Sequence, residues 1–305
     1  MTEPRVPLLR RFEPEPIVLV ELFAASNLAF LAVDIFVAHA INNFAEPAEW
    51  VPIVFSPLAT ILLGIAFAIA GLRPARVVDR NAPRALRRRI ARAIGLLVGG
   101  SSLVVGIAGL LYHLSSQFFA DQTIKHLVYT APFAAPLSYA GIGLLLVLNR
   151  LVDSKTLEWG RWVVILALGG VFGNFVLTLA DHAQNGFFNP GEWIAVIAAA
   201  IGVGALVAVV ALPTDRLARR FAFVVLAFQV GVALLGFYYH VAANLASPLE
   251  TFRQKFLYGA PAFAPLLFAD LAVLAAIGLW SIDRQPLAPN ESIQSPAVAD
   301  AISRA

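Results

Sequence analysis

Long apolar segments, separated by short polar ones, follow one another along almost the whole chain. A helix needs about 20 mostly apolar residues to cross the hydrocarbon core of a bilayer, and eight segments meet this requirement. They are residues 17–44, 50–72, 93–115, 127–151, 159–183, 193–212, 221–243 and 256–280. The pattern predicts an all-α integral membrane protein with about eight transmembrane helices.

Polar residues at the ends of these segments recur in the same order in the two halves of the chain. In the first half the order is Asn27, Asp34, His39, Asn42, Phe44, Pro47, Glu49 and Trp50; in the second it is Asn174, Asp181, His182, Asn185, Phe187, Pro190, Glu192 and Trp193. Further along, Tyr112-His113 is matched by Tyr239-His240. We therefore expect two tandem four-helix membrane repeats, residues 17–151 and 152–281. They should be parallel, because an even number of spans returns the chain to the same side.

The overall composition agrees with a membrane location. Hydrophobic residues make up 59% of the chain and charged residues only 13%, whereas a soluble domain is about 25% charged. The chain has no cysteine and a single methionine, so disulfides and thiolate chemistry are excluded. The net charge of +3 is modest and gives no support for nucleic-acid binding.

The basic residues predict how the chain is oriented. Of the 22 Lys and Arg residues, all but Lys125, Arg253 and Lys255 fall on one side of the predicted spans. Because cytoplasmic loops are enriched in Lys and Arg, we expect a multi-pass protein of the cell (inner) membrane with both termini in the cytoplasm. Residues 1–16 would be a cytoplasmic arm and residues 282–305 a disordered cytoplasmic tail.

This orientation places all five histidines at the extracytoplasmic ends of their helices, together with several acids. The candidate ligands are His39, His113, His182, His240, Asp34, Asp181, Glu49 and Glu192. Ionisable groups in apolar helices are costly, so their duplication indicates function. Imidazole with carboxylate suits Zn, Fe, Mn or Cu(II), and the lack of Cys and Met ligands argues against Cu(I). Our leading hypothesis is a periplasm-facing transition-metal site for redox chemistry or metal handling, as one shared site or two half-sites.

Two other interpretations of the histidines stay open. His39 with His113, and His182 with His240, could be axial pairs for b-type haem. Small residues on the third span would then leave room for the macrocycle: Gly95, Gly99, Gly106 and Gly109. Alternatively, the histidines hydrogen-bond lipid headgroups while the acids cap helix ends. The copies also differ by about one helical turn, since five residues separate Asp34 from His39 but Asp181 adjoins His182.

The fourth and eighth predicted spans contain prolines that remove backbone donors inside the membrane. Each begins with Tyr-x-Ala-Pro, at Tyr129 and at Tyr258, and has a second proline four residues after the first. Such a break on the same side as the histidines could form part of a ligand pocket, for which Asn27 and Asn174 are further candidates, or simply serve helix packing.

Asp270 is the deepest acid of the sequence, and the first half has Gly141 in its place. An acid inside a span is a functional candidate, for instance as a proton carrier, and Gln229 is a possible partner. The second hypothesis is therefore a small-solute transporter coupled to protons through Asp270. A third is a non-catalytic membrane subunit of a larger complex, so the protein could form homo- or hetero-oligomers in the bilayer. No catalytic residue can be named.

Overall fold

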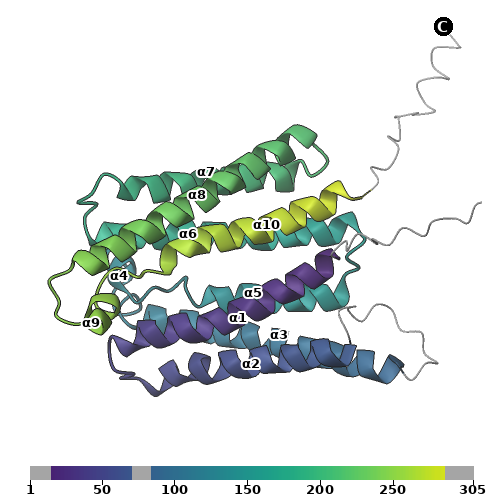
Figure 1. The fold of residues 1–305 in the computed structure, drawn as a ribbon, viewed down its shortest axis with the longest axis horizontal. Helices are drawn as coiled ribbons and strands as arrows, with labels where there is room; N and C mark the ends of the chain where they lie inside the picture. Colours follow the sequence, from purple (N-terminus) through teal and green to yellow (C-terminus); the bar gives the residue numbers. More distant parts are fainter. Residues whose placement is uncertain (1–14, 71–83, 286–305) are drawn as a thin grey trace, which may run out of the picture.

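The computed structural model describes residues 15–70 and 84–285, and every regular element in these ranges is a helix. Seven helices, counted with their short 3₁₀ extensions, are long and apolar enough to cross a membrane (Figure 1). They are α1 (Pro16–Ala40), α2 (Trp50–Ala70) with η1 (Pro47–Glu49), α3 (Arg84–Ser115), α6 (Leu157–Gln184), α7 (Glu192–Ala211), α8 (Arg216–Ala246), and α10 (Leu267–Asp283) with η2 (Ala264–Leu266). These are the helices of an all-α, multi-pass membrane protein, as the sequence predicted.

The fourth and eighth predicted spans are not continuous helices, which corrects the expectation of eight full-length spans. The fourth consists of α4 (Ile124–Tyr129) and α5 (Leu137–Leu151), and the eighth of α9 (Phe252–Leu257) followed by η2 and α10. Both breaks contain the paired prolines, which cannot donate to a helical ladder. With 15 residues, α5 is only about 22 Å long, shorter than the hydrocarbon core.

The helices pack in two groups of four. In one group α1, α2, α3 and α5 each contact their neighbours, and in the other α6, α7, α8 and α10 do the same. The groups meet along two seams, where α1 lies against α10 and α5 against α6. Figure 1 shows α1 and α10 in front, with α5 and α6 behind them.

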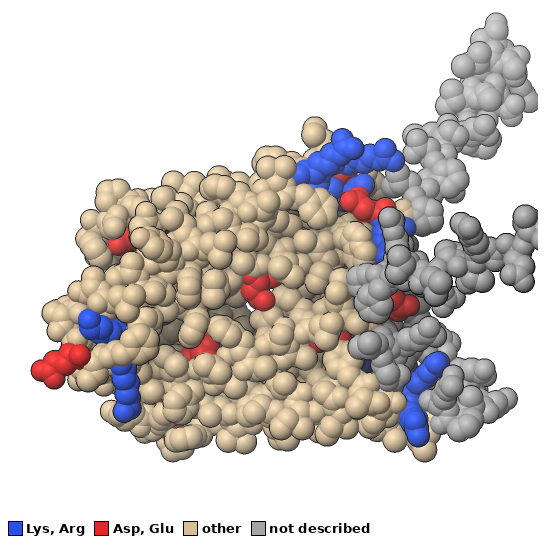
Figure 2. Space-filling model, viewed as in Figure 1, with Lys and Arg blue, Asp and Glu red and all other residues tan. Residues whose placement is uncertain are grey.

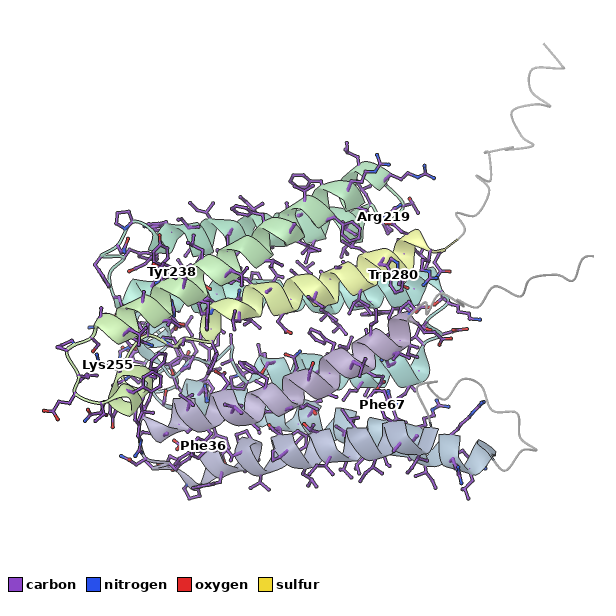
Figure 3. All side chains as sticks on the ribbon, in the orientation of Figure 1. Phe36, Phe67, Arg219, Tyr238, Lys255 and Trp280 are labelled. Atoms are coloured by element: carbon purple, nitrogen blue, oxygen red, sulfur yellow. The ribbon has the colours of Figure 1, made fainter. Side chains whose placement is uncertain are left out.

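Charged side chains are distributed unevenly along the helices. On the face drawn in Figure 2, Lys and Arg gather at the two ends of the molecule, whereas acidic side chains also occur midway between them. Figure 3 shows Arg219 at one end of the bundle and Lys255 at the other. The predicted cytoplasmic arm and tail fall almost entirely outside the described residues.

Two glycines allow α3 and α5 to approach closely. A Cβ atom on Gly143 would lie 2.5 Å from the carbonyl oxygen of Gly99 and 2.7 Å from the amide nitrogen of Leu103. Small residues at such crossings permit backbone contact between membrane helices. The α3–α5 contact is therefore closed to larger side chains at this point.

We expect Gly143→Ala to destabilise the protein by about 1–3 kcal/mol, because the added methyl group overlaps backbone atoms that cannot move aside. Thermal melting of the purified variant in detergent measures the effect. Gly141→Ala is the matched control on the same helix, since a Cβ there meets no atom within 4 Å. Equal melting temperatures for the two variants would show that α3 and α5 are not in close contact.

Candidate functional site

The first candidate site is a cluster at the end of the first helix group. His39 lies in the last turn of α1, Glu49 in η1, and His113 in the last turn of α3. The imidazole centroids of His39 and His113 are 6.3 Å apart and their planes are nearly perpendicular. Asn42 donates to Glu49 Oε1 at 2.6 Å. His39 Nδ1 and Glu49 Oε2 are buried without a hydrogen-bond partner.

A similar cluster lies at the same end of the second helix group. His182 Nδ1 is 3.4 Å from Glu192 Oε2, and His240 is close enough to His182 to interact with it electrostatically. Glu192 Oε2 is buried and lacks a hydrogen bond. Each cluster is thus formed by two histidines and one glutamate within a single group of helices.

The loops that present these clusters share one conformation. In each, a phenylalanine has a positive φ, 55° at Phe44 and 51° at Phe187. Its ring stacks on the tryptophan six residues later, with centroids 4.5 Å apart at Trp50 and 4.1 Å apart at Trp193. In each, the phenylalanine amide also donates to the carbonyl oxygen of the preceding histidine. The one-turn offset between the copies is therefore confined to the helices.

One histidine of each cluster donates a hydrogen bond to the break in a discontinuous helix. His113 Nδ1 donates to the carbonyl oxygen of Pro132 at 2.9 Å, and His240 Nδ1 donates to that of Pro261 at 2.8 Å. Because a carbonyl oxygen only accepts, Nδ1 is the donor in both rings, and Nε2 is the nitrogen that has a lone pair in the neutral form. Histidine ligands of metals show the same second contact, but here it also fixes the broken segment, whose proline carbonyls accept a backbone amide as well.

The remaining predicted ligands lie outside the two clusters. Asp34 is half-buried deeper in α1, and Asp181 is exposed near the end of α6. Neither carboxylate makes a hydrogen bond or ion pair with the residues that the structure describes. Within residues 15–70 and 84–285, no three His, Asp or Glu side chains are arranged to hold a metal ion.

The structure also removes the observation that favoured haem. The four glycines of α3 that were expected to leave room face α5 or the proline that precedes it, Pro136, whose atoms fill the space beside them: Gly95, Gly99, Gly106 and Gly109. The room expected for a macrocycle is therefore occupied by the protein itself. Tyr129 and Tyr258 are exposed at the ends of α4 and α9.

The second candidate site lies at the seam between α1 and α10. Asn27 Nδ2 donates to Asp270 Oδ1 at 2.9 Å, joining the two helix groups. Asn27 lies near the middle of α1, so the carboxylate lies far from both ends of that helix. The suggested partner Gln229 is instead buried and donates to the carbonyl oxygen of Ala198. Asn174, the counterpart of Asn27, is buried in α6.

A second contact crosses the same seam. The rings of Phe30 and Phe263 meet edge to face with centroids 5.5 Å apart. Figure 2 shows that the surface is hollowed between α1 and α10, with acidic side chains nearby. No sequence pattern indicated these contacts, because they depend on how two helices far apart in the chain are rotated. The only hint was that Asp270 interrupts the duplication.

No protein-family model, no curated protein and no solved structure matches the chain. Its own residues are therefore the guide to its function.

Proposed function

We propose that the protein is a secondary transporter for a small solute, in which Asp270 carries a coupling proton. The hydrogen bond between Asn27 and Asp270 is the observation that supports this most. It joins the two helix groups through a carboxylate that makes no ion pair with the described residues. Many transporters bind their substrate near the bilayer midplane, at the contact between two halves and beside discontinuous helices.

The proposal includes the duplicated architecture, with residues 17–151 and 152–281 as two tandem, parallel four-helix repeats. The common loop conformation and the two histidine–proline contacts support it. So do Pro136 and Pro265, which lie against Gly109 and Gly236 of their own groups: a Cβ atom added to either glycine would lie 2.8 Å from the proline Cβ. Relative movement of the two repeats would then open and close the seam.

We also propose that the protein lies in the inner membrane of the cell and that both of its termini face the cytoplasm. The distribution of Lys and Arg supports this orientation through the positive-inside bias. The two His/Glu clusters would then face the extracytoplasmic side, and Asp270 would be reached through the seam.

The coupling step follows from the charge of the carboxylate. An unpaired carboxylate inside a membrane is costly, so Asp270 binds either a proton or a positively charged group when the seam is closed. Protonation removes the negative charge that attracts the Asn27 amide, which weakens the contact between α1 and α10. Solute binding and proton binding are in this way linked to the same pair of residues.

Transport can be tested with a mixture of many candidate solutes at once. The purified protein is reconstituted into liposomes loaded with a small-molecule extract of the cells that express it, and a pH gradient is imposed. Mass spectrometry then follows the solutes that remain inside. We expect selective loss of at least one solute that requires both the protein and the gradient. Identical retention in protein-free liposomes would refute the proposal.

A second function, transition-metal binding at the two His/Glu clusters, is favoured by a separate observation. Two buried atoms of the first cluster have no hydrogen-bond partner, His39 Nδ1 and Glu49 Oε2, and Glu192 Oε2 of the second has only its 3.4 Å ion-pair contact with His182. An unsatisfied buried polar group costs about 1–3 kcal/mol, and a cation in each cluster would satisfy these atoms. Metal binding would have to draw these ligands closer together than they now lie.

We expect the purified protein to retain two zinc ions after equilibration with zinc and gel filtration, measured by elemental analysis. His113→Gln and His240→Gln should each remove about one of them, because Nε2 of each histidine is the free ligand atom. His126→Gln is the control, since the His126 ring is hydrogen-bonded to Thr123 at the start of its own helix, α4. A wild-type protein without zinc would eliminate this second function.

A further inference from the structure

The seam between α1 and α10 is open toward the side of the bundle. In Figure 1, α1 and α10 lie in front and α5 and α6 lie behind them, so no described helix lies in front of the seam, while α9 contacts α1 near one end. Asn27 and Asp270 are each half-buried, and both therefore keep accessible surface. In a membrane, the space in front of this seam is filled by lipid chains.

One of the two contacts across the seam is polar and the other is aromatic. Asn27 and Phe30 are three residues apart and share one face of α1. Asn27 holds one oxygen of Asp270, and Phe30 meets Phe263 across the gap. The seam thus brings a carboxylate and two aromatic rings to neighbouring positions.

No basic side chain of the described residues balances the charge of the Asp270 carboxylate in the hollow. No Lys, Arg or His of the described residues forms an ion pair with Asp270, and the basic side chains on this face gather at the ends of the molecule (Figure 2). Aromatic ring faces attract cations, most strongly where water is excluded. A ligand that satisfies both features has a positive charge and an apolar body.

We infer that the solute is a lipophilic cation that reaches Asp270 sideways from the bilayer, between α1 and α10. This rests on the proposed transport function and names its substrate class. Asp270 neutralises the charge of the ligand, and the rings of Phe30 and Phe263 contact its apolar groups. The equivalent seam between α5 and α6 has Gly141 in place of the acid, so one chain provides one such site.

The test is equilibrium binding of radiolabelled tetraphenylphosphonium to the protein in lipid nanodiscs. We expect one saturable site per chain. Asp270→Asn should weaken binding at least tenfold, whereas Asp270→Glu, which keeps the charge, should retain most of it. Phe30→Ala should weaken binding severalfold, and Phe228→Ala is its control, because Phe228 is a similarly exposed phenylalanine on α8.

Competition separates a bilayer ligand from a water-soluble one. An excess of tetramethylammonium should not displace tetraphenylphosphonium, because it lacks the apolar body. Equal displacement by both cations, or a folded wild type without saturable binding, would overturn the inference. Saturable binding that depends on Asp270, in a protein that fails the liposome assay, would keep the cation site and remove the transport function. Transport of other solutes without tetraphenylphosphonium binding would keep the transport function and remove the cation site.

Discussion

Asp270→Asn is expected to reduce solute transport to the level of protein-free liposomes without unfolding the protein. Asparagine at this position can still accept the hydrogen bond that Asn27 donates, so the contact between α1 and α10 is weakened, as it is by protonation, but not lost. It cannot take up or release a proton, so the coupling step is lost completely rather than slowed. The liposome assay gives the transport rate, and thermal melting shows that the variant is folded.

The control for this variant is Asp153→Asn, which removes an exposed acid in the loop between α5 and α6. Its side chain accepts from the amide of Lys155, a bond that asparagine can also accept, and transport should be unchanged. If Asp270→Asn transported as fast as the wild type, Asp270 would have no part in coupling.

Glu21→Ala is expected to cause a large loss of stability, greater than that of Gly143→Ala. The Glu21 side chain is almost fully buried in α1 and pairs with the guanidinium of Arg150 on α5. It also accepts from Asn149 at 3.0 Å, and Asn149 in turn accepts from the buried Trp159 indole at 3.1 Å. The network ties α1, α5 and α6 together. Its loss leaves a buried guanidinium unpaired, which costs about 3–5 kcal/mol.

Thermal melting in detergent measures this loss, with Glu158→Ala as the control. Glu158 is an exposed glutamate in the first turn of α6, and its removal should change stability by less than about 0.5 kcal/mol. Adding Arg150→Leu to the Glu21 variant should recover part of the stability, because no unpaired charge is then left. An unchanged melting temperature for Glu21→Ala would show that the pair is open to water.

The positions of the membrane helices could be predicted from the sequence because each apolar segment is long enough to need a helix. The breaks were harder to predict. Pro132 and Pro261 indicate where backbone donors are missing, yet proline is tolerated inside α2 at Pro57. Whether the chain bends or leaves the helix depends on distant groups. Here the carbonyls of Pro132 and Pro261 accept from the amides of Ala135 and Ala264, and His113 and His240 add a second, long-range donor to each.

The His/Glu clusters were partly predictable and the seam was not. Helix ends and short loops are local features, so the residues around His39 and Glu49 could be expected to meet. Asp34 did not join them, because its place on α1 is set by the helix and not by the loop. The contact between Asn27 and Asp270 depends on the rotation of α1 against α10, which no local pattern encodes. The glycines of α3 were interpreted as room for a macrocycle, whereas they allow α5 and the residue before it to pack closely.

Carbodiimide labelling of Asp270 tests the central claim most directly. Dicyclohexylcarbodiimide partitions into the bilayer and reacts with protonated carboxyl groups, whereas a water-soluble carbodiimide stays outside. After labelling in liposomes, mass spectrometry of peptides locates the modified acid. We predict that dicyclohexylcarbodiimide modifies Asp270 and stops transport in proportion, while the water-soluble reagent leaves Asp270 intact. An Asp270 that resists the lipid-soluble reagent, or reacts equally with both, would contradict a carboxylate reached from the side of the bundle.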